Sequence, residues 1–307
     1  PIQIKDKPQD CKTILRVGDC TYDGAKHHLN FRVDSGEVVG FYGLVGSGRT
    51  ECANAIFGIS PMESGDVELH GKKVENITTH GMIRKGLIMT PEARAHGMFK
   101  TYSLIDNIEI LFLNKFSNKF GIVNDKSAYE FSSRVLEANG VRYSSKDQMI
   151  SQLSGGNIQK IIIGRSIAVE NCSLIILDEP TNGLDPNGIN SLLTLIKKLA
   201  KNHGLTFIIS SHILSNLEQV CTKNYLLKNH KLIYLDDSDN VKYKIYTEDL
   251  SLKSLMTLLK LNGLIFERQK HDILVKGLAA VKQVMDREGI PFAYEKEGLS
   301  EVLFNEK

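Results

Sequence analysis

Two adjacent acidic residues, Asp178 and Glu179, directly follow the apolar run Leu174–Leu177. An apolar run of this length with polar neighbours predicts a strand that is buried on both faces, as in parallel sheets. Carboxylates at the point where such a strand leaves the sheet occupy the usual ligand position of an open α/β fold. One carboxylate can hold Mg²⁺ and the other can polarise a water molecule. The alternative is an acidic strand end that only faces solvent.

A glycine-rich segment, Gly43-Leu44-Val45-Gly46-Ser47-Gly48-Arg49-Thr50, lies between a predicted strand, Glu37–Tyr42, and a predicted helix, Glu51–Phe57. A phosphate-binding loop requires this order of strand, loop and helix. Glycines let the backbone curl so that successive N–H groups point inward, and the helix N-terminus adds a partial positive charge. We therefore expect this loop to bind phosphate through Gly43, Gly46, Ser47, Gly48 and Arg49, and Thr50 to offer its hydroxyl to Mg²⁺.

Arg49 stands where phosphate-binding loops generally carry lysine. A guanidinium is planar and forked, whereas an ammonium is a compact point charge that reaches between phosphates. Arg49 keeps the positive charge in a different geometry, so we expect nucleotide binding to survive better than hydrolysis.

Two further sites complete the candidate chemistry. Ser154, Gly155 and Gly156 stand at the start of a predicted helix, where a serine cap and glycines allow a close approach to phosphate. His212 directly follows the predicted strand Leu205–Ser210 and could sense a phosphate, although a lone histidine is more often structural. The other histidines have no such context, and we expect them at the surface or in turns.

The order Leu153-Ser154-Gly155-Gly156-Asn157, then Asp178-Glu179, then Gly183-Leu184-Asp185 resembles the ATP-binding cassette (ABC) ATPases. The resemblance implies an α/β fold of the P-loop NTPase class and ABC type, with a mainly parallel sheet core, an antiparallel β subdomain and an inserted helical subdomain. It implies ATP and Mg²⁺ as ligands, with Asp178 on the metal and Glu179 on the attacking water.

The same resemblance assigns further roles. His212 would contact the γ-phosphate, and Asp185 would lie in a turn that faces a second cassette in a homo- or heterodimer. Ser154, Gly155 and Gly156 would address ATP held by that second cassette. Tyr22 would stack on adenine, although an ordinary strand tyrosine is an equal alternative. Glu92 occupies the place of the usual glutamine, which touches Mg²⁺ and the membrane partner.

Residues from about 35 to 170 are similar to the second cassette of bacterial monosaccharide-importer ATPases, on the segments GLVGSGRTE, TPEARAHG and LSGGNIQK. From about residue 174 onward, TNGLDP and ISSHILSNLEQV look more like ATPases of antibiotic or bacteriocin export and immunity. We favour import, served by a transmembrane permease and, in that case, a substrate-binding protein. Export is the first alternative, and an ATP-binding regulatory cassette with little turnover is the second. A soluble ABC protein of translation or DNA repair is a weaker third.

The patterns predict a tail or linker at 1–12, a cassette at 13–238 with its helical subdomain at about 97–150, and a small α+β appendage at 239–307. The net charge of only +2 gives no sign of nucleic-acid binding. No apolar segment approaches the roughly 18–20 residues that span a bilayer, so a partner would have to hold the protein at the cytoplasmic face of the cell membrane. The 5 cysteines show no paired spacing, and we expect reduced thiols.

Overall fold

A computed structural model of the 307-residue chain describes residues 12–25, 27–93, 97–213, 217, 220–235, 242–247, 249–269, 272–276 and 278–296. Contacts divide the chain into two compact units. The first comprises Pro1–Thr222 and Leu226–Leu232, and the second comprises Lys223–Tyr225 and Ile233–Lys307. The predicted tail at 1–12 lies outside the described residues except for Lys12.

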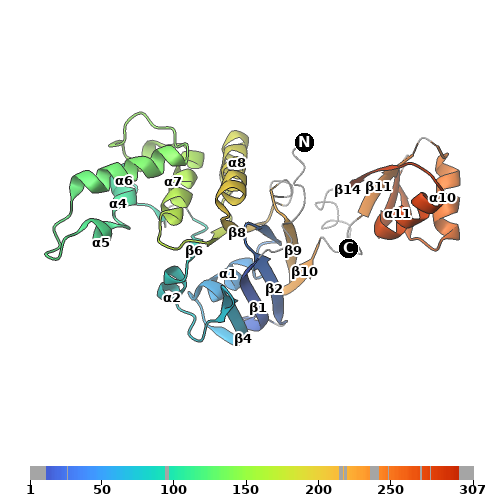
Figure 1. The fold of residues 1–307 in the computed structure, drawn as a ribbon, viewed down its shortest axis with the longest axis horizontal. Coiled ribbons are helices and arrows are strands. Elements are labelled where there is room, and N and C mark those ends of the chain that lie inside the picture. Colours follow the sequence, from blue (N-terminus) through green and yellow to red (C-terminus); the bar gives the residue numbers. More distant parts are fainter. Residues whose placement is uncertain are drawn as a thin grey trace. The chain divides into compact units, whose positions relative to one another are not determined.

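The central sheet has six strands in the order β10-β9-β3-β8-β7-β6. Figure 1 labels β6, β8, β9 and β10 of this sheet. β3, β8, β7 and β6 are parallel neighbours, so their carboxyl ends share one edge. β3, β7 and β8 are buried along their whole length, which explains why they are apolar runs without alternation. The strand bounds are β3 Val38–Tyr42, β6 Leu87–Thr90, β7 Leu174–Asp178, β8 Thr206–Ser211, β9 Lys223–Lys228 and β10 Lys231–Tyr234.

A second, antiparallel sheet has the order β2-β1-β4-β5, and β1 and β2 form a hairpin around the Asp23-Gly24 turn. Its strands are β1 Thr13–Tyr22, β2 Leu29–Asp34, β4 Met62–Leu69 and β5 Lys72–Lys73. The helices of the cassette core are α1 Arg49–Phe57, α2 Thr79–Arg84, α7 Gly155–Ile167 and α8 Pro186–His203.

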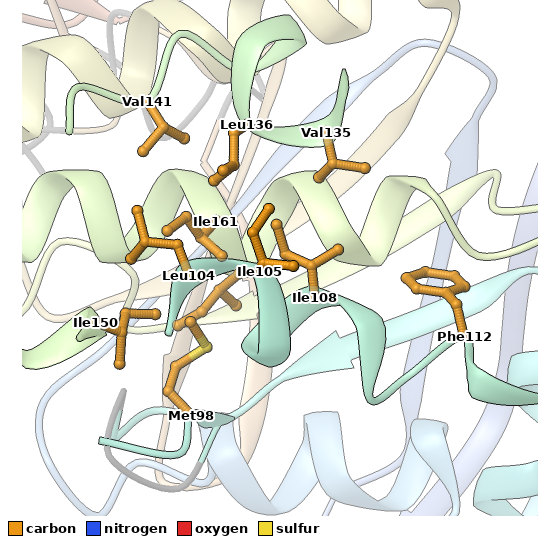
Figure 2. Packing of buried hydrophobic residues seen from close by; sticks show 11 residues of the cluster. Met98, Leu104, Ile105, Ile108, Phe112, Val135, Leu136, Val141, Ile150 and Ile161 are labelled. Atoms are coloured by element: carbon orange, nitrogen blue, oxygen red, sulfur yellow. The ribbon is translucent and has the colours of Figure 1, made fainter. Parts of the chain in front are cut away.

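A helical subdomain follows β6 and has its own buried core, shown in Figure 2. It contains α4 Leu104–Glu109, α5 Leu113–Phe116, α6 Asp125–Ala138 and the 3₁₀ turn Ile150–Gln152. Apolar residues recur at spacings of three and four around Leu104–Phe112, where the structure has α4 up to Glu109 followed by a turn. Leu104, Ile108 and Phe112 are buried in this core, whereas Leu111 is 53 % exposed, so the apolar spacing of four residues continues past the end of α4.

The C-terminal unit has the order strand, helix, strand, strand, helix, strand, which is an α+β arrangement. Its elements are β11 Lys242–Tyr246, α10 Leu252–Leu261, β12 Phe266–Gln269, β13 Asp272–Lys276, α11 Leu278–Arg287 and β14 Ala293–Lys296. The sheet order β12-β13-β11-β14 with antiparallel pairing is the ferredoxin-like βαββαβ arrangement. Ile273, Val275 and Val281 contribute to a core within the unit. In the part of the chain that the structure describes, no helix is long and apolar enough to cross a membrane.

Candidate active site

The glycine-rich segment forms a loop between β3 and α1, as the sequence predicts. Gly46 has φ 80° and Gly48 has φ 98°, both in the left-handed region that favours glycine. Gly48 is the N-cap of α1, and no side chain caps this helix end. The N–H groups of the first helical turn therefore stay available to an anion. Leu44 and Val45, at the tip of the loop, are strongly exposed.

Tyr22 supports this loop from the antiparallel sheet. Its hydroxyl donates to the Gly48 carbonyl oxygen at 3.0 Å, and the residue is only 1 % exposed. Burial raises the pKa of Tyr22, so the hydroxyl keeps its proton. A ring buried in this way presents no open face to a base, which favours the strand-tyrosine alternative over adenine stacking.

His230 also contacts the loop, and the sequence did not single it out. It lies in the turn between β9 and β10 at φ 62°. Its backbone N–H donates to the Ser47 carbonyl oxygen at 3.1 Å, and its Nδ1 lies 3.2 Å from the Tyr22 hydroxyl. A Cβ at Gly48 would come within 2.6 Å of that hydroxyl. Tyr22 and His230 together leave room only for glycine at position 48.

The two acidic residues stand at the carboxyl end of β7, where the sequence places them. Asp178 and Glu179 are 1 % and 5 % exposed. Ser210, paired with Asp178 across the parallel strands β7 and β8, donates its hydroxyl to Asp178 Oδ1. The same hydroxyl oxygen accepts the Glu179 N–H at 3.1 Å.

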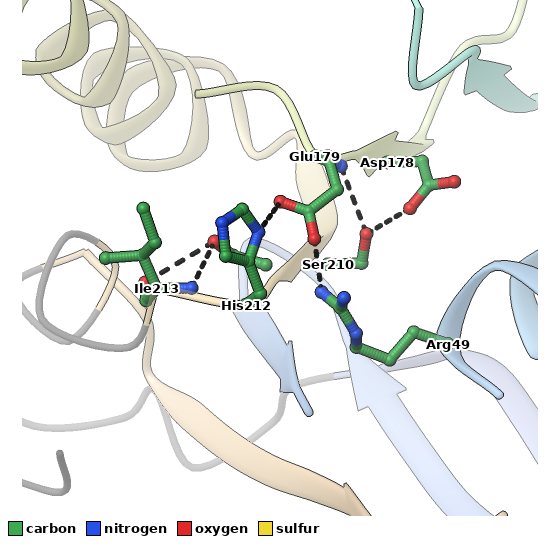
Figure 3. A network of polar contacts seen from close by, with 7 residues as sticks. Arg49, Asp178, Glu179, Ser210, His212 and Ile213 are labelled. Atoms are coloured by element: carbon green, nitrogen blue, oxygen red, sulfur yellow. Dashed lines mark hydrogen bonds and ion pairs between the residues drawn. The ribbon is translucent and has the colours of Figure 1, made fainter. Parts of the chain in front are cut away.

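Glu179 connects Arg49 of the glycine-rich loop to His212, as Figure 3 shows. Arg49 Nη1 donates to Glu179 Oε1 at 2.5 Å, and both side chains are buried, at 7 % and 5 % exposure. The other carboxylate oxygen, Oε2, lies 2.9 Å from Nδ1 of His212, whose side chain is 39 % exposed. All three residues predicted as catalytic thus meet in one network, with Glu179 at its centre.

The site has polar atoms that suit a triphosphate. Among the described residues, buried side-chain atoms without a hydrogen-bond partner include Ser47 Oγ, Arg49 Nε and Thr90 Oγ1. Ser47 and Arg49 belong to the loop, and Thr90 ends β6 at the same edge of the sheet. A buried polar atom without a partner is costly, which a bound anion or its hydration would relieve. The donor set therefore fits the predicted ligand.

The side chains at the site are also compatible with the predicted Mg²⁺. Asp178 is buried at the strand end, and Thr50 is half-buried in the first turn of α1. Within the described residues, no three His, Cys, Asp or Glu side chains gather into a metal cage. Mg²⁺ bound with a nucleotide needs no such cage, because it usually takes one or two carboxylates together with phosphate oxygens and water.

The remaining predicted residues lie elsewhere in the cassette. Ser154 is the N-cap of α7, but its side chain makes no capping hydrogen bond to the helix and instead lies 3.1 Å from Asn157 Nδ2. A Cβ at Gly156 would lie 3.1 Å from the Gly188 Cα of α8, so this glycine is needed for close helix packing as well. Asp185 is the exposed N-cap of α8, and Glu92 is exposed just after β6.

Taken together, the loop before α1 and the acidic end of β7 define a P-loop nucleotide-binding cassette with an inserted helical subdomain. Solved structures have the same fold. A nucleotide-free ATP-binding cassette from an ABC transporter matches with a TM-score of 0.63 at 23 % identity, over 72 % of this chain and 90 % of that one. The ATP-binding cassette MJ0796 bound to ADP and Pi matches with a TM-score of 0.59 at 19 % identity, over 72 % and 99 %.

The chain belongs to the ABC transporter family, whose model matches residues 26–182. It is 33 % identical over 230 residues to the ribose import ATP-binding protein RbsA of Caldanaerobacter subterraneus, covering 73 % of this chain and 46 % of the relative. It is 35 % identical over 198 residues to the arabinose import ATP-binding protein AraG of Pectobacterium atrosepticum, covering 64 % of this chain and 39 % of the relative. The chain thus spans less than half the length of these relatives. Their names agree with the resemblance of residues 35–170 to monosaccharide importers.

Proposed function

We propose that this chain is an ATP-binding and ATP-hydrolysing cassette that powers transport through a partner permease. The single observation that carries the proposal is the position of Glu179, which contacts Arg49 of the phosphate loop and His212 of the neighbouring strand end. A carboxylate buried between a cation and an imidazole is placed to orient a water molecule beside a phosphate held by the loop. Phosphoryl transfer requires mainly positioning and charge neutralisation.

Each residue has a distinct part in this proposal. The loop backbone around Gly46 and Gly48 would hold the phosphates, and Arg49 would supply a positive charge. Glu179 would orient or deprotonate the attacking water, and His212 would contact the terminal phosphate. Mg²⁺ held by Thr50 and Asp178, with Glu92 close to it, would neutralise phosphate charge.

We further propose that the cassette works as a homo- or heterodimer at the cytoplasmic face of a membrane. Ser154, Gly155, Gly156 and Asp185 would then face nucleotide held by the second cassette. The helical subdomain and the loop at Glu92 would contact the permease. The similarity to sugar-import proteins favours monosaccharide import, with a substrate-binding protein outside. The C-terminal unit and the segment from residue 174 keep an export or immunity transporter as the alternative.

Glu179→Gln tests the hydrolytic part. The variant keeps the size of the side chain and removes the base, so we expect it to bind ATP·Mg²⁺ and to lose turnover by about 10² to 10⁴-fold. Phosphate release and fluorescent-nucleotide binding would be measured on the same preparation. Equal turnover in both proteins would instead support a regulatory cassette that binds without hydrolysis.

The direction of transport needs a separate experiment. The chain would be affinity-purified with its membrane partners, and ATPase activity would be measured in proteoliposomes with ribose, arabinose or galactose and their binding protein. Stimulation by a sugar-loaded binding protein is expected for import. Stimulation by an antibiotic peptide from the cassette side, with no response to sugars, would favour export.

A further inference from the structure

Ser210 follows three apolar residues, Phe207, Ile208 and Ile209, in β8. β8 begins Thr206-Phe207-Ile208-Ile209 and is buried throughout, and Ser210 itself is 2 % exposed. A buried hydroxyl needs hydrogen-bond partners, and Ser210 finds them on the adjacent strand end. It donates to Asp178 Oδ1 and accepts the N–H of Glu179 at 3.1 Å, while the Ser210 carbonyl accepts the same N–H at 3.2 Å.

The backbone conformation of Glu179 explains why its hydrogen bonds to Ser210 matter. Glu179 has φ 45°, a left-handed conformation that is uncommon for residues other than glycine. Such a conformation persists only where the surrounding structure fixes it, and it is frequent at functional sites. The Glu179 N–H donates to both the hydroxyl and the carbonyl oxygen of Ser210, and these two bonds hold it at this point. The resulting turn carries the Glu179 carboxylate toward Arg49 and His212, as seen in Figure 3.

We propose that Ser210 is a positioning residue for nucleotide-bound Mg²⁺ and for the attacking water. It fixes the Asp178 carboxylate through its proton and the Glu179 backbone through its lone pair. One small side chain thereby sets the relative placement of both acidic residues. This inference rests on the proposed function, because it assigns Ser210 a part in the same site.

The test compares Ser210→Ala with Thr206→Ala. Thr206 supplies a second buried hydroxyl in β8, which accepts the Gly36 N–H at 3.0 Å at the opposite end of the strand. Both variants lose one buried hydroxyl, but only Ser210 touches the acidic pair. The readout is the affinity for a fluorescent ATP analogue, titrated with Mg²⁺ and repeated in EDTA, together with the melting temperature of each protein.

We expect Ser210→Ala to weaken nucleotide affinity about tenfold in Mg²⁺, a change of about 1.4 kcal/mol, and to leave affinity in EDTA unchanged. Thr206→Ala should leave the difference between the nucleotide affinities in Mg²⁺ and in EDTA as it is in the parent chain. Ser210→Thr keeps the hydroxyl and should restore the Mg²⁺ response. If Ser210→Ala does not fold, Ser210→Cys has nearly the same volume with a weaker donor and must show the same selective loss.

Two results would overturn the inference. One is a Ser210→Ala or Ser210→Cys protein whose Mg²⁺ response equals that of the parent chain. The other is an equal loss of affinity in Mg²⁺ and in EDTA, because that pattern describes general structural damage. A parent chain that binds no nucleotide under either condition would overturn the proposed function itself, which separates the two failures.

Discussion

Removing the ion pair between Arg49 and Glu179 should change the stability of the nucleotide-free protein in a characteristic way. The atoms Arg49 Nη1 and Glu179 Oε1 are 2.5 Å apart, with side chains only 7 % and 5 % exposed. Loss of one partner from a buried pair costs about 3–5 kcal/mol, since the other charge stays buried without compensation. In Arg49→Met, Glu179 retains His212, so we expect the lower end of this range, about 3 kcal/mol.

Thermal unfolding in EDTA would measure this loss. For a unit of about 150–250 residues, each kcal/mol shifts the melting temperature by about 2–4 °C, so Arg49→Met should melt about 6–12 °C lower. Glu179→Gln should also destabilise, because it leaves the Arg49 guanidinium buried. The double variant Arg49→Met with Glu179→Gln removes both charges and should recover most of the loss, giving a coupling energy above about 2 kcal/mol.

An exposed ion pair supplies the matched control. Arg16 Nη1 lies 2.8 Å from Glu68 Oε1, with side chains 61 % and 32 % exposed. Arg16→Met should change stability by less than about 1 kcal/mol, as is usual for exposed pairs. The reasoning is refuted if Arg49→Met behaves like Arg16→Met, or if the Arg49 and Glu179 changes add within about 0.5 kcal/mol.

Three further predictions follow from other parts of the chain. Gly48→Ala should lower nucleotide affinity more than Gly46→Ala, as measured by fluorescence titration. A Cβ at Gly48 would meet Tyr22 and His230, whereas nothing lies within 4 Å of a Cβ at Gly46. Equal losses of affinity would contradict this prediction. Ile108→Ala should destabilise the helical subdomain by about 2–5 kcal/mol in urea unfolding, because Ile108 is fully buried in the cluster of Figure 2. Leu111→Ala, at an exposed position, should change the free energy of unfolding little. Burial raises the pKa of the Cys172 thiol to about 12, so iodoacetamide at pH 8 should label Cys172 only after unfolding. The folded thiol keeps its proton to a higher pH than the unfolded thiol. Its contribution to the stability of the fold is therefore complete below pH 9 and is lost as the pH rises toward 12. Rapid labelling of Cys172 in the native protein would contradict the raised pKa.

The sequence predicts local features of this protein well, because they depend on short-range patterns. The buried strand before Asp178 and the order of strand, loop and helix around Gly46 are set by neighbouring residues, and the structure confirms both. Apolar spacing alone does not show where α4 ends, because Phe112 stays in the buried core after the helix has ended at Glu109.

The residues missed in the site depend on contacts between distant segments. Ser210 matters because β7 and β8 are neighbours in a register that pairs it with Asp178, and no local pattern reveals that pairing. His230 reaches the phosphate loop from a hairpin turn far along the chain. Tyr22 lies next to the loop and donates to it. Its burial depends on that same hairpin turn, so the residue pattern of its own strand does not predict it.

The glycine contact between α7 and α8 joins the starts of the two helices. With Gly156 and Gly188 backbone to backbone, neither helix start can shift sideways without pushing the other. A Cβ at Gly156 would press on the Gly188 Cα, and a Cβ at Gly188 would come within 2.8 Å of Asp185 Oδ1, so each glycine is constrained by a different neighbour. The exposed Ser154 beside them is the position in this region that can change without disturbing the contact between the two helices.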